Sequence, residues 1–472
     1  MKYNHEDSGI YLKFFFLFFI LSLICSCNTN TPNSVPQGLK VSDNHRFLST
    51  ENGDPFFWLG DTGWLLFTKL TREEAEEYLE DRRQKGFNVI QVMVLHDLRQ
   101  EVNIYGDTAL TDSQVDQPLI TPGSSFDDPA EYDFWDHIDY IIDLAGKKGL
   151  YMALVPVWGS NVRAGMVSRV QAGKYAAWIA NRYTDRTNVI WLNGGDVRGN
   201  DSTEVWNTIG TVIKRANKDQ LITYHPFGRT QSSEWFHKET WLDFNMFQSG
   251  HRRYDQDTTG LAYGEDNWKY ANADYSLVPA KPTIDGEPSY EGIPQGLHDP
   301  TQPYWTDSDV RRYAYWSVFA GCCGFTYGHS AIMQFYRQSD KPAYGAREHW
   351  NVALNAPGAS QMKFLRELIL SKSYYDRVPA NDLLAVRQGE KYDYIAVTGG
   401  NDYVLGYTCN GSDISLDLNK LPWTKYKASW FDPRTGIVSE IGANNNEGVA
   451  IFDPPGIKEQ GNDWVLMLEK EK

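Results

Sequence analysis

The chain has 472 residues, of which 41% are hydrophobic, and carries a formal net charge of −16 at pH 7. One hydrophobic core seldom organises so many residues, so we expect a large domain and a smaller one. The acidity disfavours nucleic acid and anionic membrane surfaces as partners, because like charges repel and the sequence contains no long basic run.

The amino-terminal segment has the features of an export signal. Residues 14–24 form an apolar stretch that is too short to span a bilayer but has the length of a signal-peptide core. Its end, LICSC at 23–27, resembles a bacterial lipoprotein signal with Cys27 as the lipidated residue. We expect residues 1–26 to be cleaved, residues 27–40 to act as a flexible tether, and the protein to be exported and lipid-anchored to the cell envelope, periplasmic or at the cell surface. An ordinary secretory signal is the alternative.

The cysteines of the folded body give no sign of a metal site. This part of the chain has an odd number of cysteines without metal-ligand spacing, namely Cys322, Cys323 and Cys409, and the chain contains no H-x-x-x-H pair. We therefore expect neither a metal nor another cofactor, and no disulfide framework.

Residues 41–372 are predicted to form a (β/α)₈ TIM barrel. Short apolar runs alternate with helical patterns, which is typical of βα units around a parallel sheet. A capping box at Thr71 and Glu74, with Gly86 beyond the helix end, marks one of these helices. Eight strands are expected, the number that the barrel requires, at 56–60, 89–95, 151–157, 188–192, 221–224, 244–247, 282–285 and 324–327.

A last helix around residues 360–371 ends the barrel, and the pattern then changes to short alternating runs separated by turns. Residues 373–472 are therefore predicted to form a small all-β sandwich. Its expected strands lie at 394–398, 403–407, 415–418, 426–431, 449–452 and 464–468.

Two carboxylates follow barrel strands at the end where catalytic groups collect. Asp196 ends the run NVIWLNGGD at 188–196, and Glu287 lies in the run DGEP at 285–288. Hydrolysis of a glycosidic bond needs one acid and one carboxylate facing each other across the sugar. We assign Asp196 as the general acid/base and Glu287 as the nucleophile. Asp285 is a rival to Glu287, but it lies deeper along the strand, where a structural carboxylate is favoured.

Other strand ends carry acids, amides, imidazoles and aromatic rings, which suit a polyhydroxylated ligand with apolar ring faces. As substrate-binding residues we expect Asp61, Trp64, His96, Asp97, Trp158, Asn193, His225, Gln248, His251, Tyr290, Tyr327 and His329. Structural roles are the alternative for the acids and histidines of this set. Tyr290 is also expected to donate a hydrogen bond to Glu287.

Several motifs in order along the chain resemble those of one bacterial family. They are FWLGDTGW at 57–64, GFNVIQ at 86–91, WLNGGD at 191–196, DGEP at 285–288 and WFDPRTG at 430–436. Together they look like the apiosidase-like glycoside hydrolases, family 140, of the DUF4038 type, with a barrel and a collagen-binding-like carboxyl-terminal domain.

The resemblance implies a retaining endo-apiosidase. Such an enzyme cleaves the bond between apiose and galacturonic acid in the pectin rhamnogalacturonan II, and the family's acid/base and nucleophile fall on Asp196 and Glu287. For the carboxyl-terminal domain we favour packing on the barrel over collagen binding. Two alternatives stay open: a glycosidase of the same mechanism acting on another plant glycan, and a non-catalytic glycan-binding lipoprotein.

Overall fold

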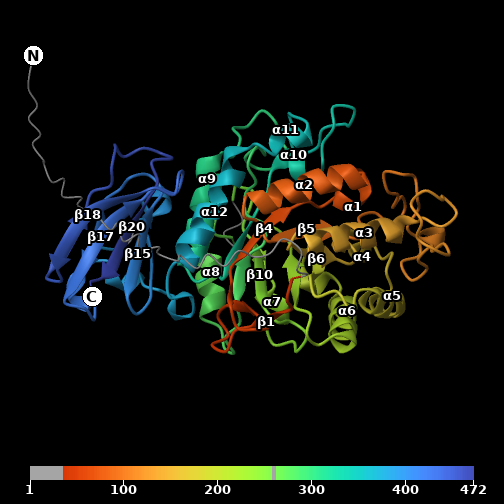
Figure 1. Ribbon diagram of the computed structural model, residues 1–472, viewed down its shortest axis with the longest axis horizontal. Coiled ribbons are helices and arrows are strands. Elements are labelled where there is room, and N and C mark those ends of the chain that lie inside the picture. The colour runs from red at the N-terminus through yellow and green to blue at the C-terminus, as the bar shows by residue number, and fades with distance from the viewer. Residues whose placement is uncertain (1–35, 258–261, 388, 472) are drawn as a thin grey trace, which may run out of the picture.

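The protein consists of a barrel and a smaller β-structure beside it, shown on the right and left of Figure 1. This computed structural model describes residues 36–257, 262–387 and 389–471. The predicted Cys27 and signal segment lie outside these residues.

Eight barrel strands are present where the sequence predicts them. They run parallel in one sheet with the order β8-β7-β6-β5-β4-β12-β11-β10, to which the short antiparallel β9 (Thr230–Gln231) is added at one edge. The barrel closes between β8 and β10, where the Asp243 N–H donates to the Ile222 carbonyl (2.9 Å). The bounds are β4 (Trp58–Thr62), β5 (Val89–Met93), β6 (Tyr151–Val155), β7 (Val189–Val197), β8 (Ile222–Pro226), β10 (Asn245–Gln248), β11 (Thr283–Asp285) and β12 (Gly324–Tyr327). The predicted fold class is confirmed.

Helices cover the outside of these strands (Figure 1). The predicted capping box of α2 is confirmed, since Thr71 Oγ1 accepts from the Glu74 N–H (3.3 Å) and Glu74 Oε2 accepts from the Thr71 N–H (3.0 Å). The longer helices are α2 (Arg72–Gln84), α3 (Phe134–Lys147), α5 (Arg169–Arg182), α6 (Thr203–Ala216), α8 (Trp268–Tyr275), α9 (Asp307–Phe319) and α12 (Pro357–Leu370). Short helices are α1 (Leu66–Lys69), α4 (Gly159–Arg163), α7 (Ser233–Phe236), α10 (Ser330–Met333) and α11 (Trp350–Ala353).

The first described residues close the bottom of the barrel. The small antiparallel sheet β1 (Leu39–Val41), β2 (Leu48–Thr50) and β3 (Pro55–Phe56) shares a hydrophobic core with the barrel strands. The Tyr151 hydroxyl, at the amino end of β6, donates to the Gln37 carbonyl at 2.6 Å. The Thr187 hydroxyl, just before β7, donates to the Pro36 carbonyl, also at 2.6 Å. Residues 36–40, which we expected in a flexible tether, are therefore fixed against the end of the barrel opposite to the catalytic mouth.

The carboxyl-terminal region is all-β, as predicted. A six-stranded antiparallel sheet has the order β13-β14-β15-β20-β17-β18, and β16 and β19 form a second sheet that shares its core. β13 and β18 are not among the predicted strands; β18 lies at the sheet edge and is largely exposed. The bounds are β13 (Val378–Pro379), β14 (Ala396–Gly399), β15 (Tyr403–Thr408), β16 (Ile414–Asp417), β17 (Lys425–Phe431), β18 (Val438–Asn445), β19 (Val449–Phe452) and β20 (Trp464–Lys470).

The two parts are joined by buried polar and aromatic contacts. Arg311 of α9 donates twice to Asp463 (2.9 and 2.8 Å), and both side chains are almost fully buried. Trp268 of α8 stacks on Tyr394 with ring centres 4.1 Å apart. The carboxyl-terminal domain therefore packs on the barrel through helices α8 and α9.

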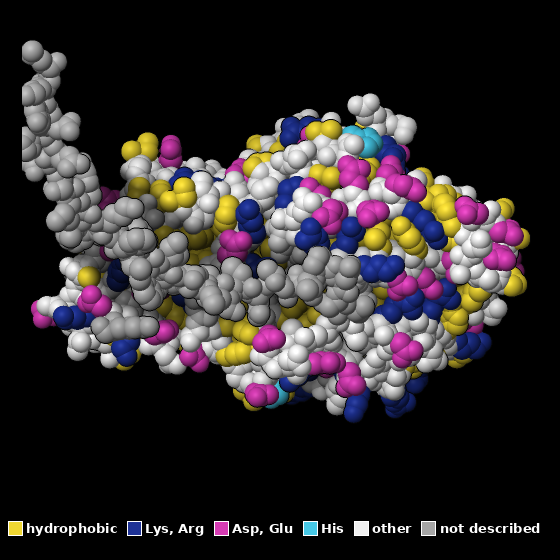
Figure 2. All heavy atoms as spheres, in the orientation of Figure 1, with side chains coloured by type: hydrophobic (Ala, Val, Ile, Leu, Met, Phe, Trp, Pro, Cys, Tyr) yellow, Lys and Arg dark blue, Asp and Glu magenta, His cyan; other side chains and the backbone are white. Residues whose placement is uncertain are grey.

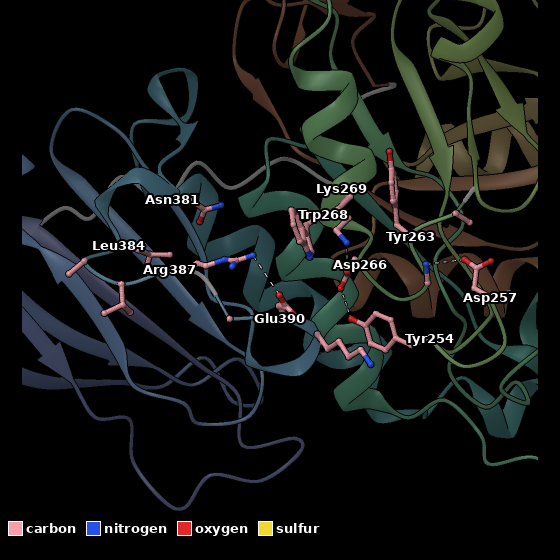
Figure 3. A pocket seen from close by; sticks show the side chains of 16 residues that line it. Tyr254, Asp257, Tyr263, Asp266, Trp268, Lys269, Asn381, Leu384, Arg387 and Glu390 are labelled. Atoms are coloured by element: carbon pink, nitrogen blue, oxygen red, sulfur yellow. Dashed lines mark hydrogen bonds and ion pairs between the residues drawn. The ribbon is translucent and has the colours of Figure 1, made fainter. Parts of the chain in front are cut away.

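A groove of about 930 Å³ runs along this junction (Figure 3). Four of its charged side chains form two pairs, since Lys269 lies 2.7 Å from Asp266 and Arg387 lies 3.6 Å from Glu390. Trp268 already stacks on Tyr394 and thus has one ring face covered.

On the face shown in Figure 2, basic and acidic side chains are interspersed over the barrel. Within the described part of the chain, none of the helices is long and apolar enough to cross a membrane.

Candidate active site

A cavity of about 540 Å³ opens at the carboxyl ends of the barrel strands. Asp196 and Glu287 both line it, although they are 91 positions apart in the chain. The predicted residues Trp64, His96, Trp158, Gln248, His251 and Tyr290 line the same cavity. The structure therefore brings the two predicted catalytic acids together with half of the predicted substrate-binding set.

Asp196 reaches the cavity through an irregularity in β7. The register with β8 shifts between Gly194 and Val197, and three consecutive residues have positive φ: 94° at Gly194, 109° at Gly195 and 53° at Asp196. All other residues of the eight barrel strands are buried, whereas Asp196 is partly exposed. The irregularity thus turns one carboxylate out of an otherwise buried strand.

The two glycines before Asp196 are required by close packing. A Cβ on Gly194 would lie 2.6 Å from the His225 carbonyl oxygen, and one on Gly195 would lie 2.6 Å from the Trp158 ring. Only glycine tolerates both the positive φ and this lack of space. The GG of the motif therefore sets the position of the acid.

The surroundings of Asp196 favour its protonated form. Burial raises its pKa, and repulsion from Glu287 adds to this effect, so that the pKa rises from 3.8 to about 6. A carboxyl group that keeps its proton in weakly acidic solution can act as a general acid.

The surroundings of Glu287 have the opposite effect. Burial would raise its pKa, but two histidines outweigh it: His225 Nε2 lies 3.1 Å from Oε2, and His251 Nε2 lies 3.1 Å from Oε1. Their hydrogen bonds and charge lower the pKa of Glu287 to about 2. Glu287 is therefore ionised over the range in which Asp196 holds a proton, the division of roles that glycoside hydrolysis needs.

Tyr290 lies beside Glu287, and its ring packs edge-on against His251 at 4.7 Å. Its buried hydroxyl has no well-aligned hydrogen bond within the described residues but interacts with the Glu287 carboxylate, so the predicted donation to Glu287 stays a prediction. Burial and the neighbouring carboxylate raise the pKa of Tyr290 well above its usual value.

Aromatic rings form one wall of the site. The Trp64 ring lies 5.3 Å from that of Trp158 and 5.2 Å from His225. These rings come from the ends of β4, β6 and β8, and the two indoles line the cavity directly. Such a wall suits the C–H face of a sugar ring.

Three predicted substrate-binding residues are sealed inside the protein. Asp61 is fully buried and accepts from Tyr78 Oη (2.7 Å), with Arg82 3.5 Å away. Asn193 donates to the Trp206 carbonyl (2.8 Å), and Tyr327 donates to Glu291 (2.6 Å). The prediction that these side chains lie at the mouth is wrong, because they point to neighbouring helices and loops.

Two more predicted residues are engaged locally instead of lining the cavity. His329 caps α10 by accepting from the Ala331 N–H (3.1 Å), and Asp97 accepts from the Arg99 N–H (3.1 Å). The structural role favoured for Asp285 is confirmed, since it is fully buried and bonded to Ser249 (2.7 Å) among other polar groups.

The cavity also contains residues that the sequence did not reveal. They lie past the strand ends, on loops and at the end of α10, where no local motif marks them: Phe227, Arg229, Arg252, Leu297, His298, Met333, Gln334 and Tyr344. Two are cationic, and burial together with repulsion from Arg252 lowers the pKa of Arg229. Across the described residues, no group of three or more His, Cys, Asp and Glu side chains is arranged to hold a metal ion.

Comparison with known proteins agrees with this geometry. Residues 42–376 match the family described as "Apiosidase-like, catalytic domain", and residues 378–469 match the "Putative collagen-binding domain of a collagenase". A search of curated proteins found no match.

Two solved structures are similar over nearly the whole chain. One, described as a glycoside hydrolase, is 45% identical, covers 93% of this chain and 99% of its own, and has a TM-score of 0.87. The other, a glycoside hydrolase family 5 protein from Bacteroides vulgatus ATCC 8482, is 42% identical, covers 93% and 95%, and also has a TM-score of 0.87. The chain therefore belongs to the apiosidase-like family and is a glycoside hydrolase.

Proposed function

We propose that the protein is a retaining endo-apiosidase that cleaves the bond between apiose and galacturonic acid in rhamnogalacturonan II. The observation that carries the mechanism is the opposite protonation of two carboxyl groups in one cavity, with the pKa of Asp196 raised to about 6 and that of Glu287 lowered to about 2.

Double displacement assigns each group its role. Glu287 attacks the anomeric carbon while Asp196 gives its proton to the departing glycosidic oxygen, which leaves a glycosyl ester on Glu287. Asp196, now ionised, then takes a proton from water as that water attacks the same carbon. The C–O bond to Glu287 breaks, and both carboxyl groups return to their starting states.

The cations of the cavity support an acidic sugar beside the scissile bond. Arg229 and Arg252 both line the site, and the Arg229 side chain is half-buried, 3.8 Å from Asp257. Repulsion between the two guanidinium groups is relieved when a carboxylate binds between or beside them. Galacturonic acid carries such a carboxylate, whereas a neutral mannan or glucan does not.

The sequence features of export complete the proposal. An exported lipoprotein, anchored through Cys27, would meet pectin fragments at the cell envelope, with the lipid as its contact with the membrane. The carboxyl-terminal domain packs against α8 and α9, which supports a stabilising role for it.

The decisive experiment incubates residues 36–472 with purified rhamnogalacturonan II and follows products by mass and by NMR of the anomeric proton. Release of a fragment ending in apiose, with the anomeric configuration retained at first appearance, is expected. Asp196→Asn and Glu287→Gln should each lower turnover by at least about 10²-fold without unfolding the protein. Cleavage of another plant glycan but not this pectin would replace the substrate, and initial inversion would replace the mechanism.

A further inference from the structure

Two loops meet at the rim of the catalytic cavity. Leu297 and His298 come from the loop after β11, and Tyr344 comes from the loop after β12 and α10; all three line the cavity. The rings of His298 and Tyr344 lie 5.5 Å apart. Tyr344 is 40% exposed, although it is a large aromatic side chain.

The loops are pressed together, which fixes the two rings. A Cβ on Gly345 would lie 2.5 Å from Pro294 Cγ, and the Arg347 guanidinium stacks 3.6 Å above the Tyr304 ring. The first loop is also tied to the nucleophile's partner, since the Gly296 N–H donates to the His251 carbonyl (2.8 Å). Movement of this rim is thereby restricted from both sides.

Backbone strain gathers at the same place. Among the described residues, nine besides glycine have a positive φ, and four of these line the catalytic cavity: Asp196, Arg229, Leu297 (82°) and Tyr344 (51°). Such conformations cost free energy and persist where the surrounding structure enforces them, commonly at functional sites. Glycine would adopt the backbone conformation of Tyr344 with less strain, so the aromatic side chain at this position costs folding free energy.

Tyr344 lines the same cavity as Asp196 and Glu287. Burial raises the pKa of the Tyr344 phenol, and the negative charges of Asp196 and Glu287 raise it further. Within the described residues the phenol hydroxyl forms no hydrogen bond. The ring and the hydroxyl are thus available to a molecule lying over the two acids.

We infer that Tyr344, supported by His298, is a platform that binds the sugar ring held over Asp196 and Glu287, and so helps to determine which saccharides the enzyme accepts. An aromatic face at the rim contacts the apolar C–H face of the sugar, while the hydroxyl bonds one of its oxygens. This inference rests on the proposed glycosidase site, and it adds a binding residue that does no chemistry.

The test uses the inactive Glu287→Gln protein as parent and measures binding of oligosaccharides prepared from rhamnogalacturonan II by calorimetry. Tyr344→Gly should weaken binding by about tenfold or more, the loss expected for one aromatic contact, while the melting temperature stays equal or rises. Tyr344→Phe, which keeps the ring, should recover most of the affinity. Tyr263→Ala is the matched control, since Tyr263 is 38% exposed but lines the junction groove instead of the cavity.

In the active enzyme the same Tyr344→Gly change should raise KM and leave kcat nearly unchanged. Equal binding by parent and Tyr344→Gly would overturn the platform and leave the proposed function intact. A parent that binds no oligosaccharide of the pool would overturn the proposed substrate and this inference together.

Discussion

His251 Nε2 lies 3.1 Å from Glu287 Oε1, so an imidazole beyond the end of β10 favours the ionised form of the proposed nucleophile. A hydrogen bond to a charged group contributes about 1.5–3 kcal/mol. In His251→Ala, loss of this donor should raise the pKa of Glu287 and move the acid limb of kcat/KM upward by about one to two pH units. The measurement is the pH profile between pH 2 and 6. His96→Ala, which lines the cavity without contacting Glu287, should leave that limb in place.

The decrease of kcat/KM at high pH should reflect the ionisation of Asp196. It must hold a proton to act as the general acid, and its pKa is raised to about 6 by burial and by Glu287. As pH rises through this value the proton is lost, so kcat/KM should fall above pH 6 by about tenfold per unit. Full activity persisting beyond pH 8 would remove Asp196 from this role, because the residue would then be ionised throughout.

Gly195→Ala should lower kcat by more than its loss of folding free energy explains. The new Cβ would meet the Trp158 ring at 2.6 Å and push the neighbouring Asp196 out of place. Gly53→Ala is the matched control, since Gly53 also has a positive φ (89°) but has open space around it. Gly53→Ala should lose about 1–2 kcal/mol of folding free energy and Gly195→Ala more, because of the clash, while kcat of the folded protein falls only in Gly195→Ala. Equal kcat in the two folded variants would show that the site tolerates the added methyl group.

The buried Arg311–Asp463 pair should be essential for docking of the two domains. Asp463→Asn removes the buried countercharge of Arg311 and leaves only the partly exposed Asp307 (2.6 Å) as its acidic partner, which should cost about 3 kcal/mol. Urea unfolding followed by tryptophan fluorescence measures this loss. Glu440→Gln breaks the exposed pair with Lys427 (3.2 Å) and should cost about 1 kcal/mol or less. Similar losses in the two variants would contradict a special role for the buried pair.

The sequence was sufficient to predict the barrel because the barrel strands are buried on both faces. Such strands appear as continuous apolar runs with turn residues at their ends, and all eight lie close to their predicted positions. β18 escaped prediction for the opposite reason: it is an exposed edge strand without an apolar alternation.

The candidate site was only half predictable. Position at a strand end identified Asp196 and Glu287, but it does not say whether a side chain points into the barrel or toward a helix, which is why Asp61 and Tyr327 were misplaced. Tyr344 could not be found at all. Its place at the rim depends on a left-handed backbone and on packing between distant loops, and neither leaves a local pattern in the sequence.

Pro36 and Gln37 are clasped at the amino ends of β6 and β7, whereas the two carboxyl groups open at the other end of the barrel. An attachment made before residue 36 would therefore join the described part of the chain at the end of the barrel opposite to the catalytic cavity. If the enzyme were immobilised by that end, its catalytic cavity would face the solution. A bulky polymer could then reach the cavity without obstruction by the support.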